Sequence, residues 1–461
     1  MTLTIALCFI VWTIIFVPRY YYPLKGFTVT RYHKLAIFLL FKLAIYVTLF
    51  YLYFHHHSIT IGGLTTNLLG SVTDTKILYF TMYIFYILAL ALLALYPYFN
   101  MQPWSFQLFS IVAMSSAYAI SSKAYPTLYF CVEIGTLATI IYLSLLKYQL
   151  SKATYSYQEL TGALRYFVIA ALSTSLYTIG FILYLLETNS LQLGNHTAIL
   201  NIGLVTLFLS IIVKIGLFPF SDYPPKVYEG TDYPGLLLLA VLAKIILIYL
   251  VVGFSAYQPL ALVTGLASLL IGTLRAFSAT TIKSFLAYSG ITAMGLILLT
   301  KATEINQESY ALIYYYVIYS FNLTGVILVL KILGITKDYI ISLMNSAYKW
   351  PVLCLGLFIF ILSKAGLPPL IGFLGKFYIF SYLVQGKYTI SLIIVVIFSL
   401  ITLINYIRVF SLLLYSEIKT YNIIPPSGGL YFKAYSPNAT LIAKLGIIAL
   451  LYAFGYTYLS E

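Results

Sequence analysis

Long apolar segments follow one another along the whole chain, and charged residues or clusters of Pro, Gly and Asn separate them. Each segment, at roughly 20 residues, is long enough to cross a hydrocarbon core roughly 30 Å thick. Backbone groups in lipid must be satisfied within the chain, so the pattern predicts helices. We expect an all-α, polytopic membrane protein with about 14 transmembrane helices, at 3–17, 35–54, 76–98, 104–121, 126–146, 163–186, 197–218, 234–254, 258–274, 281–300, 309–333, 350–384, 389–412 and 439–459.

Composition and charge agree with this segmentation. The chain is 62% hydrophobic and only 8% charged, which excludes a water-soluble domain. Its net charge of +14 comes from 26 Lys and Arg residues scattered singly, a distribution that indicates loop charge and no nucleic-acid partner. With the N-terminus outside, 17 of these 26 residues fall in inner connections and four in outer ones, as the positive-inside rule predicts. Both termini are then predicted outside.

Five lysines fall inside predicted spans and face a single intramembrane carboxylate. A charge at the bilayer centre costs roughly 2.5 to 3.5 kcal/mol, so such lysines usually face a protein interior or a hydrated path. Burial also disfavours the charged ammonium, which lets a lysine lose and regain a proton near neutral pH. A proton relay needs this property, and the candidates for one are Lys42, Lys214, Lys244, Lys364 and Lys376, with Glu133 as the acid.

The alternative is that these lysines snorkel to the interface or only satisfy a broken helix. For Lys42 and Lys364 we favour that inert interpretation over a role in the relay. Glu133 could likewise cap or hydrogen-bond a neighbour, although a lone intramembrane carboxylate is by default a functional candidate.

A short motif, Lys-x-Gly-Leu-x-Pro, occurs at 214–219 and again 150 residues later at 364–369. Gly and Pro should interrupt the seventh and twelfth helices, with breaks at Gly216, Pro219, Gly366, Pro368 and Pro369. Five spans separate equivalent positions, and an odd number inverts the second copy relative to the first. We therefore expect two inverted five-helix repeats, at 101–254 and 255–412, flanked by a three-helix segment at 1–100 and a loop and last helix at 413–461.

Motifs for cofactors are not apparent. Cys8, Cys131 and Cys354 lie in apolar segments without paired spacing, and we interpret them as small core residues. The run His55–His57 lies at a span end and is interpreted as a solvated loop, because three adjacent imidazoles point in different directions. The sequence predicts no cofactor and no metal site in this chain.

Several segments resemble the antiporter-like membrane subunits of NADH:ubiquinone oxidoreductase, respiratory complex I. The longest is the run Lys214-Ile-Gly-Leu-Phe-Pro-Phe-Ser-Asp-Tyr-Pro-Pro-Lys-Val-Tyr-Glu-Gly230, followed by Leu-Ala-Lys244. In order along roughly residues 100 to 415 come Lys283-Ser-Phe-Leu-Ala-Tyr-Ser289 with Met294-Gly295, then Gly366-Leu-Pro-Pro-Leu-Ile-Gly-Phe-Leu-Gly-Lys-Phe377, then Tyr406-Ile-Arg408.

The resemblance implies a proton path through Glu133, Lys214, Lys244 and Lys376. Lys364 and Lys283 are weaker candidates, which the resemblance does not supply. In that family the acid pairs with the first lysine, and the second passes protons toward the third. The sequence departs from the family pattern at Ser221, Tyr223, Lys226 and Ala293, which removes protonatable groups at the edge of the path, and Lys364 stands where the family more often has an apolar residue.

The resemblance also implies a fungal-type mitochondrial subunit in the inner membrane, with both termini on the intermembrane-space side. Its partners would be other membrane-arm subunits, lipids and protons, and FMN, iron–sulfur clusters and quinone would reside in other chains. Three alternatives remain: a free-standing cation/proton antiporter, a structural or lipid-binding subunit with inert lysines, and a membrane-embedded oxidoreductase.

Overall fold

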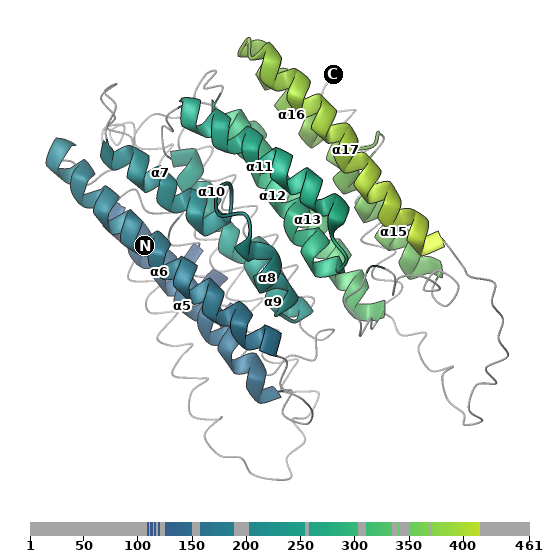
Figure 1. The fold of residues 1–461 in the computed structure, drawn as a ribbon, viewed down its shortest axis with the longest axis horizontal. Coiled ribbons are helices and arrows are strands. Elements are labelled where there is room, and N and C mark those ends of the chain that lie inside the picture. Colours follow the sequence, from purple (N-terminus) through teal and green to yellow (C-terminus); the bar gives the residue numbers. More distant parts are fainter. Residues whose placement is uncertain are drawn as a thin grey trace, which may run out of the picture. The chain divides into compact units, whose positions relative to one another are not determined.

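A computed structural model of the chain describes its central part as a bundle of helices (Figure 1). The described residues are 108–109, 111–113, 115–116, 119, 125–149, 157–188, 202–253, 258–302, 310–333, 340, 351–368 and 370–414. All of them belong to the second of two compact units, Thr73–Glu461. The predicted helices near both termini, Lys42, Cys8, the His55–His57 run and Pro369 lie outside the described residues.

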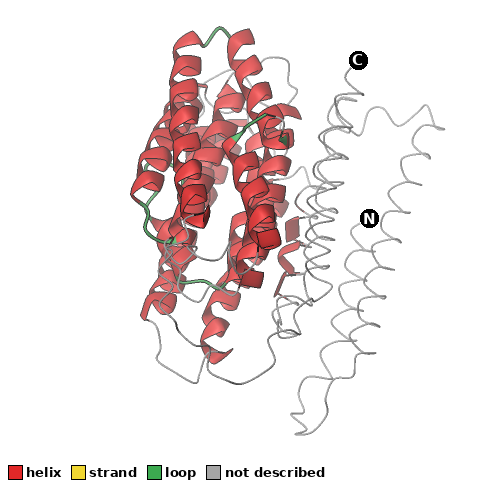
Figure 2. Ribbon diagram, turned by 90° about the vertical axis from the view of Figure 1, so that its right-hand side faces the viewer, coloured by secondary structure: helices red, strands yellow, loops and turns green. Residues whose placement is uncertain are grey.

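The described residues form helices and no strand, which confirms the all-α prediction. In Figures 1 and 2 the helices lie roughly side by side, and in Figure 1 they follow chain order across the view. They are α5 (Tyr125–Gln149), α6 (Tyr157–Thr188), α7 (Ile202–Ile215), α8 (Tyr223–Glu229), α9 (Tyr233–Leu237), a π-helix (Leu238–Leu242), α10 (Ala243–Gly253), α11 (Gln258–Ser278), α12 (Ile282–Ala302), α13 (Tyr310–Leu333), α15 (Pro351–Ala365), α16 (Ile371–Gln385) and α17 (Thr389–Leu414).

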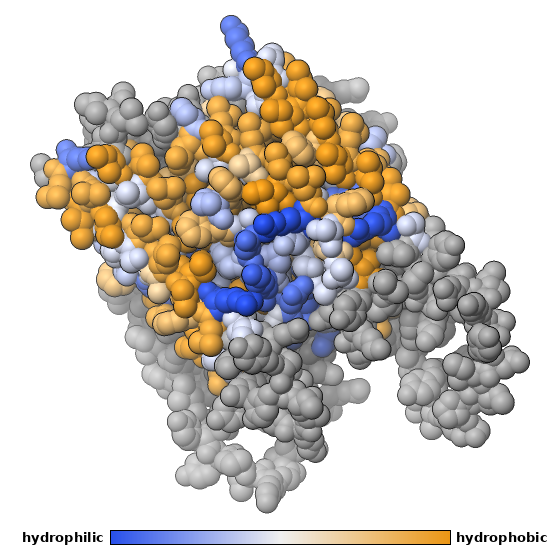
Figure 3. Space-filling model, in the orientation of Figure 1, coloured by the Kyte–Doolittle hydropathy of each residue, from blue (hydrophilic) through white to orange (hydrophobic). Residues whose placement is uncertain are grey.

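Seven of the described helical segments are long and apolar enough to cross a membrane. Burial separates the central helices from the peripheral ones. Of the apolar stretch in Ile282–Ala302, 94% is buried, whereas only 22% of that in Thr389–Ser411 is buried. Because both are strongly apolar, the exposed faces of the second suit contact with lipid or another protein. Figure 3 shows one face of the molecule, on which hydrophobic residues cover most of the described surface and hydrophilic ones gather in a limited area.

Small residues bring neighbouring helices close together. At the crossing of α6 and α7, a Cβ on Gly180 would lie 2.6 Å from the Thr206 hydroxyl oxygen and 2.8 Å from the Leu207 nitrogen. Small residues at such positions allow backbones to approach closely. In lipid there is no hydrophobic driving force between helices, so this close van der Waals packing drives their association.

Both predicted helix breaks are present and share one geometry. α7 ends before Gly216 and α15 before Gly366, and both glycines have φ of 82°, the left-handed region that favours glycine. Each end is a Schellman motif, in which two N–H groups beyond the helix bind carbonyls of its last turn. The bonds are Gly216 to Ile212 and Val213, Leu217 to Ile212, Gly366 to Leu362 and Ser363, and Leu367 to Leu362.

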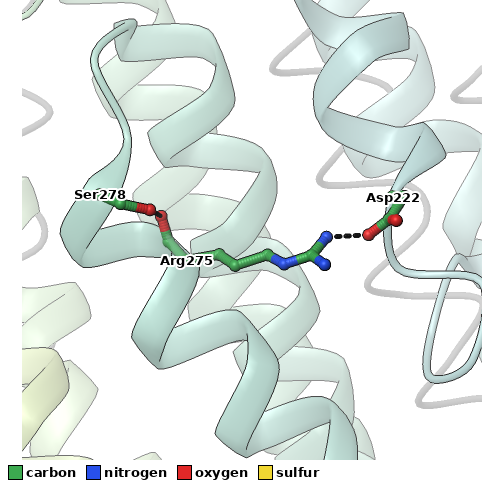
Figure 4. Close-up of polar contacts among 3 residues, drawn as sticks. All are labelled: Asp222, Arg275 and Ser278. Atoms are coloured by element: carbon green, nitrogen blue, oxygen red, sulfur yellow. Dashed lines mark hydrogen bonds and ion pairs between the residues drawn. The ribbon is translucent and has the colours of Figure 1, made fainter.

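The chain after the first break differs from the sequence prediction, whereas after the second it continues into α16, as the predicted broken helix 350–384 required. The first break continues into the short helix α8, where a loop was expected, and Asp222 precedes its two prolines. Asp222 forms an ion pair with Arg275 in the last turn of α11, where Ser278 also bonds the Arg275 carbonyl (Figure 4). Both charged side chains are exposed, so this pair fixes the position of the segment more than it stabilises the fold.

The first prediction concerns the break at Gly216. Replacing Gly216 with Ala should destabilise the protein, because the left-handed conformation costs about 1–2 kcal/mol for a residue with a Cβ and the new methyl group would overlap the Pro224 ring. The measurement is the thermal stability of the purified membrane complex. Gly162→Ala in α6 is the control, since its Cβ would meet nothing closer than 3.5 Å. Equal stability of the two variants would contradict the assigned geometry.

Candidate functional site

Two of the predicted path lysines line one cavity of about 40 Å³. Lys214 lies in the last turn of α7, directly before the first break, and Lys244 is the second residue of α10. Tyr166, Tyr223 and other residues complete the wall. A single water needs roughly 10–15 Å³, so this cavity has room for about three or four.

Lys214 is unusually placed for a charged group. Its Nζ is buried and has no hydrogen-bond partner within the described part of the chain. Glu133 on α5 interacts with it electrostatically, although the two form no ion pair within 4 Å. A buried amine with a nearby carboxylate and space for water is an arrangement in which a proton can be held or released.

Lys244 is positioned by a local irregularity in its helix. The π-helix Leu238–Leu242 directly precedes α10. Its wider turn rotates the side chains of α10 about the helix axis relative to a continuous α-helix. The Val241 carbonyl in this π-helix accepts a hydrogen bond of 2.7 Å from the Tyr316 hydroxyl of α13. This shift, which no sequence pattern indicated, sets the direction in which Lys244 leaves the helix.

Two further lysines line a second cavity, of about 30 Å³. Lys364 lies in the last turn of α15, before the second break, and Lys376 lies in α16 after it. Lys364 Nζ donates to Ser289 Oγ at 3.4 Å and lies 5.2 Å from the centre of the Tyr319 ring. The wall is polar by the standards of an apolar bundle, with Thr292, Asn322, Ser363, Ser399 and Thr402 among its residues.

The two breaks use different hydrogen-bond donors to satisfy a backbone carbonyl at the end of the helix. At the first, the Tyr223 hydroxyl donates to the Lys214 carbonyl. At the second, Lys376 Nζ donates to the Ala365 carbonyl at 2.7 Å. Carbonyls at a helix C-terminus carry partial negative charge, so the second break attracts an ammonium group directly.

The structure separates Lys283 from both cavities. Lys283 is buried near the start of α12, and its Nζ lies 5.6 Å from the centre of the Tyr233 ring. It interacts electrostatically with Asp232. The cysteines Cys131 and Cys354 are buried, as expected of core residues.

Asp232 is a half-buried carboxylate in the connection between the predicted helices 197–218 and 234–254. It caps α9 by accepting from the Gly235 N–H at 2.9 Å, and the Tyr142 hydroxyl donates to its two oxygens at 3.1 and 3.0 Å. Burial raises the pKa of Asp232, and the Gly235 N–H, Tyr142 and the charges of Lys331 and Lys283 oppose that shift. An Asp two residues before Pro at a helix start was a usable capping signal.

The second prediction tests this cap. Asp232→Ala should lower the free energy of unfolding by about 1–2 kcal/mol, because it removes an N-cap and leaves the Tyr142 hydroxyl without its acceptor. Asp232→Asn, which keeps a side-chain oxygen, should be close to the wild type. Thermal denaturation of the purified complex measures both, and an Ala variant as stable as the Asn variant would refute the capping role.

The chain matches known proteins over this same region. Residues 124–402 match the family described as NADH:quinone oxidoreductase/Mrp antiporter, transmembrane. NADH-ubiquinone oxidoreductase chain 2 of Metridium senile is 27% identical over 314 residues, covering 65% of this chain and 80% of the relative. NADH-quinone oxidoreductase subunit N of Rhodospirillum rubrum is 29% identical over 321 residues, covering 65% of this chain and 64% of the relative.

Solved structures share the fold. A chain of respiratory complex I from Thermus thermophilus, solved with bound aureothin, superposes with a TM-score of 0.70 at 22% identity, over 91% of this chain and 96% of the other. A chain of the Mrp complex from Dietzia sp. gives 0.60 at 14% identity, over 76% of this chain and 74% of the other.

The fold and the paired lysines define the class: an antiporter-like membrane subunit with broken helices, as the sequence predicted. The family match spans more than half of the length of this chain. The chain therefore belongs to the NADH:quinone oxidoreductase/Mrp antiporter transmembrane family.

Proposed function

We propose that this chain is the antiporter-like, proton-translocating membrane subunit of mitochondrial respiratory complex I. The relatives named as NADH-ubiquinone and NADH-quinone oxidoreductase subunits support this assignment. In this proposal the chain lies in the inner membrane among other membrane-arm subunits and lipids, with both termini on the intermembrane-space side. Electron transfer from NADH to ubiquinone, with its FMN and iron–sulfur clusters, takes place in other chains.

One observation carries the proposal: four lysines lie in pairs in two cavities of about 40 and 30 Å³ beside two equivalent helix breaks. Inert lysines that snorkel would extend toward headgroups and would not line internal cavities. Cavities with polar walls and room for water are what proton transfer between amines requires.

The proton-transfer sequence begins at Glu133 and Lys214. With Glu133 ionised, its charge stabilises the Lys214 ammonium. When quinone reduction elsewhere in the complex shifts the local field, the pair weakens and Lys214 releases its proton into the 40 Å³ cavity. Lys244 accepts it there, and Lys376 later delivers it toward the outer side.

The third prediction tests this pair. Lys214→Met and Glu133→Gln should each lower the initial rate of NADH-driven proton pumping by at least about tenfold, since a positioned proton-transfer group typically contributes a factor of at least about 100. The measurement is the quenching of a pH-gradient dye in proteoliposomes containing the intact complex, with assembly checked on native gels.

Lys387→Met is the matched control, because Lys387 is an exposed lysine between α16 and α17. Pumping at the wild-type rate in both path variants would refute the proposed role. A free-standing cation/proton antiporter, the main rival, would instead purify without a large complex and would exchange protons for cations without NADH.

A further inference from the structure

The two cavities do not meet, and this leaves a gap in the proton path. They have no lining residue in common. Lys244 is the last lysine of the first cavity along the path, and Lys376 belongs to the second. A proton that reaches Lys244 therefore needs a group that bridges the protein between the cavities.

Ser289 of α12 and Tyr319 of α13 belong to the wall of the second cavity, and Gly290, next to Ser289, brings this wall close to Lys244. A Cβ built on Gly290 would lie 2.8 Å from the Tyr319 hydroxyl and 3.6 Å from Lys244 Nζ. The glycine thus leaves one small space that both groups approach. In the same helix turn, Ser289 Oγ accepts from Lys364 Nζ, whose ammonium also lies over the Tyr319 ring.

Lys244 and Lys364 therefore approach the same turn of α12 and the same tyrosine, one from each cavity. Their charges also interact directly. Two like charges in a buried site disfavour double protonation, so a proton that arrives on one amine favours the departure of a proton from the other.

We propose that Lys364 is the proton carrier that joins the two cavities, between Lys244 and Lys376. This assignment rests on the proposed proton-translocating function, and it replaces the inert role that the sequence alone favoured for Lys364.

The step balances without any oxidant or reductant. The Lys244 ammonium gives up one proton and becomes a neutral amine, and the neutral Lys364 amine takes up one proton and becomes an ammonium. The Tyr319 hydroxyl relays the proton by donating one and accepting one. Lys364 then passes its proton to neutral Lys376 across the cavity that both line.

A purely structural role for Lys364 would be charge placement over an aromatic ring. The Tyr319 ring attracts any cation at 5.2 Å, including one that never loses its proton. Arginine separates these roles because it keeps the charge and the ring contact but does not deprotonate in proteins. Methionine removes the charge at similar length.

The fourth prediction compares Lys364→Met and Lys364→Arg in the intact complex in proteoliposomes. Both should lower NADH-driven proton pumping by at least about tenfold, because each removes a group that must gain and lose a proton. Native gels should show normal assembly, and Lys387→Met should pump normally.

The outcomes are distinguishable. Normal pumping in the Arg variant with slow pumping in the Met variant would reduce Lys364 to a fixed charge and overturn the inference. Normal pumping in both Lys364 variants would also overturn the inference. The proposed function would still stand in that case if Lys214→Met and Lys376→Met pumped slowly. If those variants also pumped normally, both proposals would fail.

The fifth prediction leaves every lysine in place. Gly290→Ala should slow pumping by about tenfold, because the methyl group displaces the Tyr319 hydroxyl from the gap, and misplacement by about 1 Å can cost up to a hundredfold in rate. Gly162→Ala is the control, since its Cβ fits without close contacts. This test decides the matter if the Lys364 variants fail to assemble: a well-assembled Gly290→Ala complex that pumps normally would overturn the inference.

Discussion

Unpaired backbone carbonyls inside an apolar bundle are the constraint on which this structure depends. Where α7 and α15 end within the bundle, their last carbonyls lose their helical partners and need other donors. The Schellman bonds satisfy some of them, and Tyr223 and Lys376 satisfy the Lys214 and Ala365 carbonyls. The polar groups that satisfy these carbonyls also stabilise amines in the interior. The helix breaks and the buried lysines therefore depend on the same set of polar groups.

This view explains why the two helix breaks are alike in backbone and different in chemistry. The left-handed glycine and the hydrogen bonds after it are the same in both, 150 residues apart. The donors differ: a phenol at the first break and an amine at the second. The first break therefore leaves Lys214 Nζ without a hydrogen bond in the described part of the chain, near a carboxylate, whereas the second holds Lys376 against a carbonyl. The two lysines would respond differently to the same change in field.

Much of this arrangement could be predicted from the sequence because it follows from strong local signals. Gly216 and Gly366 marked the breaks, and lysines within apolar runs marked the candidate path. The π-helix before Lys244 left no pattern, since hydropathy is insensitive to one additional residue per turn. Asp232 was treated as a loop residue because its burial depends on Tyr142, 90 positions away. The position of Lys364 beside Ser289 and Tyr319 likewise depends on contacts between distant helices.

The close fit between Gly366 and Lys376 limits how this chain can evolve. A Cβ at position 366 would lie 2.7 Å from Lys376 Cδ, so the lysine stem fills the space that any other residue would need. Position 366 is thus restricted both by its dihedral angle and by its neighbour. Substitution there would require a compensating change at position 376, and the two sites should vary together or not at all as lineages diverge.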